Sequence, residues 1–269
     1  MDKLEGRVAA ITGGGSGIGR ALAEQLSRLG CHVALIDINQ ERLEEVAGAC
    51  ARDGLKVTTH VADVSDRDRV KALADEVVEA HGGVQILANI AGVTAWGPFE
   101  EMSFEDIDWM LGVNLHGVIN GCKFFLPHLR KEDEAHIVNV SSLLGILAVR
   151  HQVAYCASKF AVRGFTEALD AELDGSPINV SIVHPGGVAT NMVTDSRAAD
   201  LEAKNKFADL VAEYSMKPDK VAAKIIAAIR KKKLRVIVGP DGWVGDWMKR
   251  AFPTRGQRTL ARYVKKSMP

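Results

Sequence analysis

The residues whose types and spacing best suit catalysis are a tyrosine and a lysine one helical turn apart. Tyr155 and Lys159 are spaced i, i+4 in a predicted helix and therefore share one of its faces. An unperturbed tyrosine, with a pKa of about 10, is a poor acid or base at neutral pH, whereas a nearby ammonium favours the phenolate. The spacing therefore predicts that Lys159 lowers the pKa of Tyr155 and activates it for proton transfer.

Polar residues on other predicted elements give this pair a context. Alone, a tyrosine and a lysine one turn apart are usually an edge of the core and a solvated face. Here Ser142 follows a predicted strand, thirteen residues before Tyr155, and Asn114 interrupts a helix that is otherwise apolar. The combination indicates a proton-transfer site assembled from several elements.

A glycine-rich turn directly follows the first predicted strand. It reads Thr-Gly-x-x-x-Gly-x-Gly from Thr12 to Gly19 and opens a helix. Unpaired backbone amides and the positive helix end would face an anion there, and glycine lets the backbone approach that anion closely. A flexible loop before a helix is the alternative, but the density of glycines favours a phosphate cradle. No Gly-Lys-Ser/Thr follows the turn, so a P-loop is excluded.

Acidic residues end the second and third predicted strands, where a ligand would meet the carboxyl edge of a parallel sheet. Asp37 lies twenty residues after Gly17 and can accept hydrogen bonds from an adenosine ribose. Asp63 and Val64 end the third strand and would contact an adenine, although an isolated aspartate there more often caps a helix. These positions predict a ligand that contains adenosine.

Short apolar runs that alternate with amphipathic helical patterns would position these residues. Several runs are continuous and aliphatic, as expected for strands covered by helices on both faces. Repeated strand–helix–strand order predicts an α/β fold with a doubly wound parallel sheet. The predicted strands are Arg7 to Thr12, His32 to Asp37, Lys56 to Val61, Ile86 to Asn89, Ala135 to Ser141, Asn179 to His184 and Arg235 to Val238. The predicted helices are Ile18 to Gly30, Gln40 to Asp53, Ser65 to His81, Ser103 to Pro127 and Tyr155 to Leu173, with another opening at Pro218.

Two segments break this alternation. Residues 190–216 form a polar, helix-prone insertion beside the carboxyl edge of the sheet, which is typical of a substrate lid. We therefore expect one domain over residues 1–239, with the lid inserted at about 190–216, and a tail over residues 240–269. From Lys224 to Pro269 the chain has thirteen Lys and Arg against two acidic residues.

The basic tail is also amphipathic. Its apolar residues fall on one helical face and a shorter second face; they are Trp243, Val244, Trp247, Met248, Ala251 and Phe252, then Leu260, Tyr263 and Val264. An aromatic face with basic flanks is typical of an interfacial helix on anionic lipid. The alternative is that the face packs on its own domain or on a neighbouring subunit. The sequence leaves both open.

Composition sets the broad class of the protein. The 269 residues are 47% hydrophobic and 25% charged, as in a soluble globular protein, and Lys plus Arg equals Asp plus Glu at 34 each. Because the formal net charge is zero, the protein as a whole has no electrostatic field that would attract nucleic acid. The four cysteines lack metal-ligand or disulfide spacing, so we expect no metal and a reducing compartment. No secretory signal or run of 18 apolar residues occurs, which favours a cytoplasmic protein.

Taken together, these motifs resemble those of the short-chain dehydrogenase/reductase family. They run in order along the chain as Thr12 to Gly19, Asp63, Asn89 to Gly92, Asn114, Ser142, Tyr155 with Lys159, and Pro185-Gly186 with Thr190. Ile90 is one departure, since many members carry a second asparagine there. The resemblance implies a single-domain Rossmann-type fold and a homodimer or homotetramer built through the two long helices.

The resemblance also implies roles for these residues. Tyr155 would exchange a proton with an alcohol or carbonyl oxygen while hydride moves to or from a nicotinamide. Ser142 would orient that oxygen, Lys159 would also hold the nicotinamide ribose, and Asn114 would anchor a water in a proton relay. The expected cofactor-binding residues are Gly13, Ser16, Gly17, Ile18, Gly19, Asp37, Asp63, Val64, Asn89, Ala91, Gly92, Tyr155, Lys159, Pro185, Gly186, Val188 and Thr190.

These features predict an NAD-linked oxidoreductase acting on a hydrophobic secondary alcohol or ketone. The carboxylate of Asp37 would repel the 2′-phosphate of NADP. Arg42 is the nearest basic residue that could offset this repulsion, and its side chain is expected to point to solvent. The expected substrate pocket is largely apolar, with Val93, Trp96, Leu143, Leu144, Ile146, Val149, Met192 and Val193. The alternative is a non-catalytic, dinucleotide-binding regulatory module of the same fold.

Overall fold

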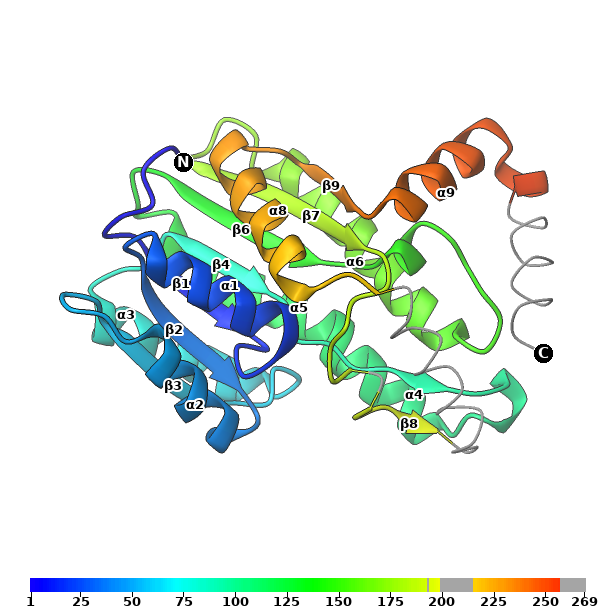
Figure 1. Ribbon diagram of the computed structural model, residues 1–269, viewed down its shortest axis with the longest axis horizontal. Coiled ribbons are helices and arrows are strands. Elements are labelled where there is room, and N and C mark those ends of the chain that lie inside the picture. Colours follow the sequence, from blue (N-terminus) through cyan, green and yellow to red (C-terminus); the bar gives the residue numbers. More distant parts are fainter. Residues whose placement is uncertain (193, 199–214, 257–269) are drawn as a thin grey trace.

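A seven-stranded parallel sheet forms the centre of the computed structural model, which describes residues 1–192, 194–198 and 215–256 (Figure 1). Its strand order is β3-β2-β1-β4-β6-β7-β9, and every neighbouring pair is parallel. The strands are β1 Val8–Thr12, β2 His32–Asp37, β3 Val57–Val61, β4 Ile86–Asn89, β6 Ala135–Val140, β7 Ile178–Pro185 and β9 Arg235–Val238. The predicted doubly wound, Rossmann-type sheet is confirmed.

Helices cover both faces of this sheet. The α-helices of the described residues are α1 Gly17–Arg28, α2 Gln40–Cys50, α3 Arg67–His81, α4 Phe104–Leu111, α5 Gly117–Leu129, α6 Val153–Glu172, α8 Pro218–Lys231 and α9 Pro240–Ala251. The core beneath α1, α2 and α8 contains Leu22, Leu43 and Ile225. The opposite core contains Leu73 of α3, Phe125 of α5 and Val162 of α6. Because both faces are covered, the inner strands are buried and largely apolar without alternation, whereas the edge strand β3 is partly exposed.

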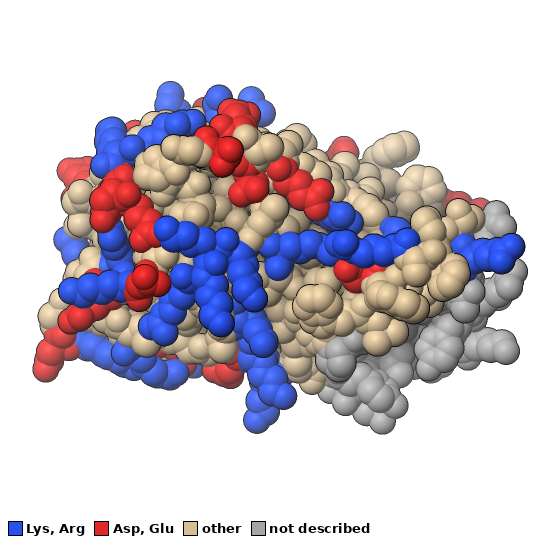
Figure 2. All heavy atoms as spheres, turned by 90° about the horizontal axis from the view of Figure 1, so that it is seen from above, with Lys and Arg blue, Asp and Glu red and all other residues tan. Residues whose placement is uncertain are grey.

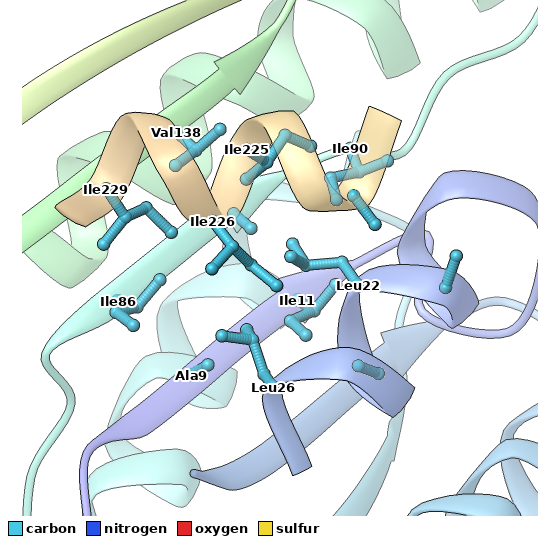
Figure 3. Packing of buried hydrophobic residues seen from close by; sticks show 14 of the residues in the cluster. Ala9, Ile11, Leu22, Leu26, Ile86, Ile90, Val138, Ile225, Ile226 and Ile229 are labelled. Carbon is cyan, nitrogen blue, oxygen red and sulfur yellow. The ribbon is translucent and has the colours of Figure 1, made fainter. Parts of the chain in front are cut away.

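Aliphatic side chains from α1 and α8 interlock above the middle of the sheet. Figure 3 shows Leu22 and Leu26 of α1 beside Ile11 of β1, with Ile226 of α8 approaching from the other side. All four are buried, Ile226 at 7% exposure being the most accessible. Close packing of this kind fixes the position of β1 and therefore of the glycine turn that follows it.

The predicted helix from Ser103 to Pro127 is wrong as a single continuous element. The chain forms α4, then a π-helical turn over Gly112–His116, then α5, which ends at Leu129. Pro127 lies within the last turn of α5 instead of ending it. A π turn inserts extra chain into the helix and changes the direction of the side chains that follow. Asn114 lies in this turn and is completely buried.

Short strands outside the main sheet connect the segment after β4 with the predicted insertion. β5 Ala95–Trp96 pairs in parallel with β8 Arg197–Ala198. Neither strand is predicted from the sequence, because two-residue strands carry no periodic signal. Most of the predicted lid, including Val193 and residues 199–214, lies outside the described residues.

The first part of the predicted tail forms the helix α9, which follows β9 directly (Figure 1). Its predicted apolar face does not pack on the domain: Trp243, Val244, Trp247 and Phe252 are 62%, 67%, 67% and 53% exposed. Among the described residues, most of this face is therefore not covered by its own domain, and packing on a neighbouring subunit stays a prediction. The second predicted face, with Leu260, Tyr263 and Val264, lies outside the described residues.

Within the described part of the chain, no helix is both long and apolar enough to cross a membrane. The same residues contain no group of His, Cys, Asp or Glu side chains that could hold a metal ion. All four cysteines are buried and unpaired.

Candidate active site

A cavity of about 560 Å³ lies at the carboxyl edge of the sheet. Residues from the ends of β1, β2, β3, β4, β6 and β7 line it, because parallel strands bring their carboxyl ends to one edge. Sixteen of the predicted site residues line the cavity, namely Gly13, Ser16, Gly17, Ile18, Asp37, Asp63, Val64, Ala91, Gly92, Ser142, Tyr155, Lys159, Pro185, Gly186, Val188 and Thr190. Segments far apart in the sequence thus meet at one site.

The glycine turn after β1 is shaped by close backbone approaches. Gly13 has a φ of +67°, and a Cβ there would lie 2.9 Å from the backbone of Ala91. Gly17 has a φ of +50°, and its Cβ would lie 2.8 Å from the Cγ2 atom of Thr190. At Gly19 a Cβ would meet the carbonyl oxygen of Gly13 at 2.0 Å. Only glycine fits these positions, and the turn therefore presents bare backbone to the cavity at the N-terminus of α1.

Asp37, at the end of β2, borders the same turn. Its Oδ2 atom accepts a hydrogen bond from the backbone N–H of Gly15 at 3.0 Å, and its Oδ1 atom accepts one from Asn39 at 3.1 Å. These two bonds fix the carboxylate at the rim of the cavity. Each oxygen keeps a lone pair, so the group can accept hydrogen bonds from a diol.

Arg42 also lines the cavity, so the expectation that it points away to solvent is wrong. Its guanidinium donates a hydrogen bond to the carboxylate of Asp195 at 3.0 Å. Asp195 belongs to the segment after β7, so the pair joins that segment to α2 at the edge of the cavity. No local pattern could reveal a contact between residues 153 positions apart.

The fit of the cavity to a dinucleotide follows from these features. The bare turn at a helix N-terminus suits a pyrophosphate, and the fixed carboxylate of Asp37 suits a ribose diol. Asp63 and Val64 line the cavity beyond β3, where an adenine would extend. The residues present therefore match the parts of NAD or NADP in the order in which those parts are linked.

Tyr155 and Lys159 lie together on α6 and both line the cavity. The Nζ atom of Lys159 lies 5.8 Å from the centre of the Tyr155 ring and donates a hydrogen bond to the carbonyl oxygen of Val140 at 3.1 Å. Both side chains are buried: Tyr155 is 8% exposed and Lys159 2%. The predicted face-sharing of the pair is therefore present in the fold.

Burial has opposite effects on the two groups because it disfavours the charged form of each. It raises the pKa of Tyr155 to about 12, and a hydrogen bond with the Ser142 side chain offsets part of that rise. It lowers the pKa of Lys159 to about 8. The expected lowering of the Tyr155 pKa by Lys159 is not seen in this arrangement, because the ammonium is directed at Val140 and the loss of solvent dominates.

Ser142 is positioned by the turn that follows β6. Its Oγ atom accepts a hydrogen bond from the backbone N–H of Leu144 at 3.0 Å and caps the 3₁₀ turn Leu143–Gly145. Gly145 packs against α6, where a Cβ would lie 2.7 Å from the carbonyl oxygen of Lys159. This close approach sets the distance between the Ser142 turn and the helix that carries Tyr155.

Asn114 stands behind the cavity and is not part of its lining. Its Oδ1 atom accepts from the Val93 N–H at 2.8 Å, and its Nδ2 atom donates to the Val93 carbonyl at 2.9 Å and to Ser158 Oγ at 3.1 Å. The amide thereby fastens the segment after β4 to α6. A Cβ on Gly92 would lie 3.2 Å from this Oδ1 atom and 3.3 Å from Lys159 Nζ, so both polar atoms face Gly92.

Two predicted cofactor residues do not line the cavity. Asn89 is buried and donates a hydrogen bond to Asn139 at 2.8 Å, so its side chain joins β4 to β6. Gly19 supports the turn from behind, against Gly13. Both positions act on the site through its framework.

The part of the cavity predicted to receive a substrate has a mostly apolar lining. Val93, Trp96, Leu143, Leu144, Val149 and Met192 line it, together with Trp109 and Val113, which the sequence analysis did not select. Ile146 is buried in a separate cluster with Leu147 and Ile237 and does not line the cavity. The sulfur of Met192 lies over the hydroxyl of Tyr155.

Known proteins share both the sequence pattern and the fold of this chain. The family profile described as short chain dehydrogenase matches residues 7–201. SadH of Mycobacterium tuberculosis, an oxidoreductase by its name, is 40% identical over 275 residues, which cover 100% of this chain and 99% of SadH.

Two solved structures extend the comparison. A short chain dehydrogenase/reductase from Burkholderia phymatum in complex with NAD has a TM-score of 0.88 and 31% identity, covering 93% of this chain and 95% of that one. An alcohol dehydrogenase from the archaeon Thermococcus sibiricus, complexed with 5-hydroxy-NADP, has a TM-score of 0.74 and 28% identity, covering 86% of this chain and 94% of that one.

Proposed function

The chain belongs to the short-chain dehydrogenase/reductase family of NAD(P)-dependent oxidoreductases, and we propose that it interconverts a hydrophobic secondary alcohol and its ketone with a preference for NAD. The observation that carries this proposal is the convergence of Ser142, Tyr155 and Lys159 with the glycine turn at one cavity. A proton-transferring phenol beside a dinucleotide cradle matches the needs of alcohol–carbonyl chemistry.

The residues proposed to hold the dinucleotide follow the cavity from one end to the other. Asp37 would accept the hydrogen bonds of the adenosine ribose, and the Gly13–Gly19 turn would hold the pyrophosphate. Lys159 and the segment from Pro185 to Thr190 would hold the nicotinamide end. When bound, this cofactor accepts hydride from the alcohol or supplies it to the ketone.

In the direction of carbonyl reduction, Tyr155 would donate its proton to the substrate oxygen. With a pKa raised to about 12, its hydroxyl is protonated at neutral pH and is ready to act as a donor. Ser142 would orient the same oxygen through its hydroxyl. The ammonium of Lys159 would stabilise the phenolate that remains, since opposite charges attract strongly in a buried site.

Asn114 would support proton return to Tyr155. Both of its amide hydrogens are used, but its Oδ1 atom accepts only one described hydrogen bond and keeps a lone pair toward Gly92. A water held there would lie near Lys159. This arrangement fits the proposed relay from solvent to the lysine and on to the phenol.

The preference for NAD rests on charge at the adenosine ribose. The carboxylate of Asp37 would repel a 2′-phosphate, and the guanidinium of Arg42, which could offset that repulsion, is paired with Asp195. The apolar lining at the other end supports a hydrophobic substrate. A small-molecule substrate is what the family in general uses.

A panel of secondary alcohols, with NADH absorbance as the readout, tests the proposed function. We expect turnover with NAD and hydrophobic alcohols, and loss of about 10² to 10⁴ in rate for Tyr155→Phe with little change in dinucleotide Kd. If Tyr155→Phe retained more than about a tenth of the wild-type kcat, the assignment of Tyr155 would be wrong. Dinucleotide binding without turnover across the panel would instead favour a regulatory module of the same fold.

A further inference from the structure

We propose that the outer face of α9 docks on the surface of an anionic lipid membrane. The proposal concerns a surface outside the cavity, and its test does not depend on the enzymatic activity. It rests on the orientation of α9, the side chains at its outer face and the charge around it.

The inner face of α9 is built from small and polar residues. A Cβ on Gly242 would lie 2.6 Å from the side chain of Ile237, and a Cβ on Gly245 would lie 2.5 Å from that of Leu147. Glycine at both positions therefore lets the helix backbone sit close to the domain. The helix turns its least apolar side inward, which is the reverse of an ordinary surface helix.

Charged contacts fix this orientation. Asp246, 6% exposed, forms a bidentate pair with Arg235 of β9 at 2.7 and 3.0 Å. Lys249 donates a hydrogen bond to the carbonyl oxygen of Ile146, and its Nζ atom lies 4.5 Å from the centre of the Phe160 ring. A bidentate carboxylate–guanidinium pair is both strong and directional, so α9 is held in one rotation about its axis.

The outer face carries large apolar side chains in the open. Trp243 and Trp247 are spaced i, i+4, and Val244 and Phe252 extend the same exposed side. Each of the four is more than half exposed. Soluble surfaces seldom gather two tryptophans and a phenylalanine in this way, and aromatic rings of this kind favour the boundary between lipid and water.

The charge around this face selects an anionic partner. Arg250 and Arg255 are exposed at the end of α9 and just after it, whereas the carboxylate of Asp246 is buried in its pair with Arg235. Figure 2 shows Lys and Arg side chains gathered across the middle of the upper face of the molecule and extending toward the side from which α9 projects in Figure 1. Basic residues beside an apolar face attract anionic lipid, whereas a second copy of this surface would oppose like charges.

The docked helix would lie next to the substrate end of the cavity. The Cβ position of Gly242 is 3.7 Å from Leu143, which lines that cavity. Leu147, against Gly245, belongs to the same segment after β6. A membrane bound at the outer face of α9 would therefore lie one helix away from the apolar lining of the cavity.

Co-sedimentation of the full chain with vesicles tests this proposal. We expect at least about tenfold more protein bound to phosphatidylcholine vesicles that contain phosphatidylglycerol than to pure phosphatidylcholine, with release by high salt. The double variant Trp243→Ser/Trp247→Ser should lose this binding and the accompanying shift in tryptophan emission. Phe104→Ala is the matched control, because Phe104 is 83% exposed on α4 and should leave binding unchanged.

Two results would overturn the lipid assignment. Equal binding to both kinds of vesicle would show that the binding does not depend on lipid charge. No binding to either kind would show that the outer face of α9 does not bind lipid. If the double variant instead reduced the oligomeric state measured by sedimentation velocity in the absence of lipid, the face would be a contact between copies of the chain. Unchanged dinucleotide Kd in the double variant would show that its fold is intact.

Discussion

The sulfur atom of Met192 lies 4.0 Å from the phenolic oxygen of Tyr155. A residue of the segment after β7 thus covers the atom proposed to transfer the proton. The methyl group of the same side chain lies 3.6 Å from the Cβ position of Gly92, at the centre of the cavity. We therefore expect the apolar part of a substrate whose oxygen reaches Tyr155 to contact Met192.

We expect Met192→Ala to change substrate preference more than turnover. Full burial of a methionine is worth about 1.5 to 3 kcal/mol, and Met192 is partly buried, so the kcat/KM of bulky apolar substrates should fall by up to about tenfold relative to small ones. Kinetics on a series of ketones of increasing size would measure this ratio. Met102→Ala is the control, because Met102 packs in the same cluster but does not line the cavity. An equal fall for all substrates would contradict a contact role.

We expect carbonyl reduction to weaken above about pH 8, the value to which burial lowers the pKa of Lys159. Below that pH the ammonium is present and stabilises the Tyr155 phenolate, and above it the charge is lost. A pH profile of kcat/KM would show this limb. Lys159→Arg keeps a cation at every accessible pH and should move the decline upward, although with lower activity. If kcat/KM of Lys159→Arg fell at the same pH as that of the wild type, the decline would belong to another titrating group.

Asp195→Asn should relax the preference for NAD. The pair with Arg42 is partly exposed, with side-chain exposures of 38% and 52%, so it is worth only about 0 to 1 kcal/mol. Releasing Arg42 toward a 2′-phosphate should raise kcat/KM with NADP by up to about fivefold. Asp37→Ala should have a larger effect, since it removes the like charge itself. Asp106→Asn, which breaks a similar surface pair with Arg197, should leave the ratio unchanged; a rise there would refute the specific role of Asp195.

Gly13→Ala should destabilise the protein and weaken dinucleotide binding. Alanine at a φ of +67° is strained by about 1 to 2 kcal/mol, and its Cβ would also meet the Ala91 backbone at 2.9 Å. Gly54→Ala is a matched control, because Gly54 has a φ of +79° but nothing within 4 Å of the Cβ position. Thermal melts should show a larger fall in Tm for Gly13→Ala, and only that variant should raise the dinucleotide Kd. Equal effects would mean that backbone strain alone accounts for both.

The sequence alone determined the seven strands of the main sheet, most of the helices around them and most of the cavity lining. Continuous apolar runs and helical periods are local signals, and the Thr12–Gly19 turn and the Tyr155–Lys159 spacing each lie within one short segment. Because parallel strands end at a common edge, the order of the elements also predicted that these segments would meet.

Tertiary structure decided the features that depend on direction and long-range contact. The π turn sets the direction of the Asn114 side chain. The side chain of Asn89 points into the protein interior, where it donates a hydrogen bond to Asn139. The opposite ionisation shifts of Tyr155 and Lys159 follow from burial, which the i, i+4 spacing does not encode. On α9 the periodicity located the apolar face, but which side packs was decided by the steric fit of two glycines and the Asp246–Arg235 pair, contacts that exist only once the domain has folded.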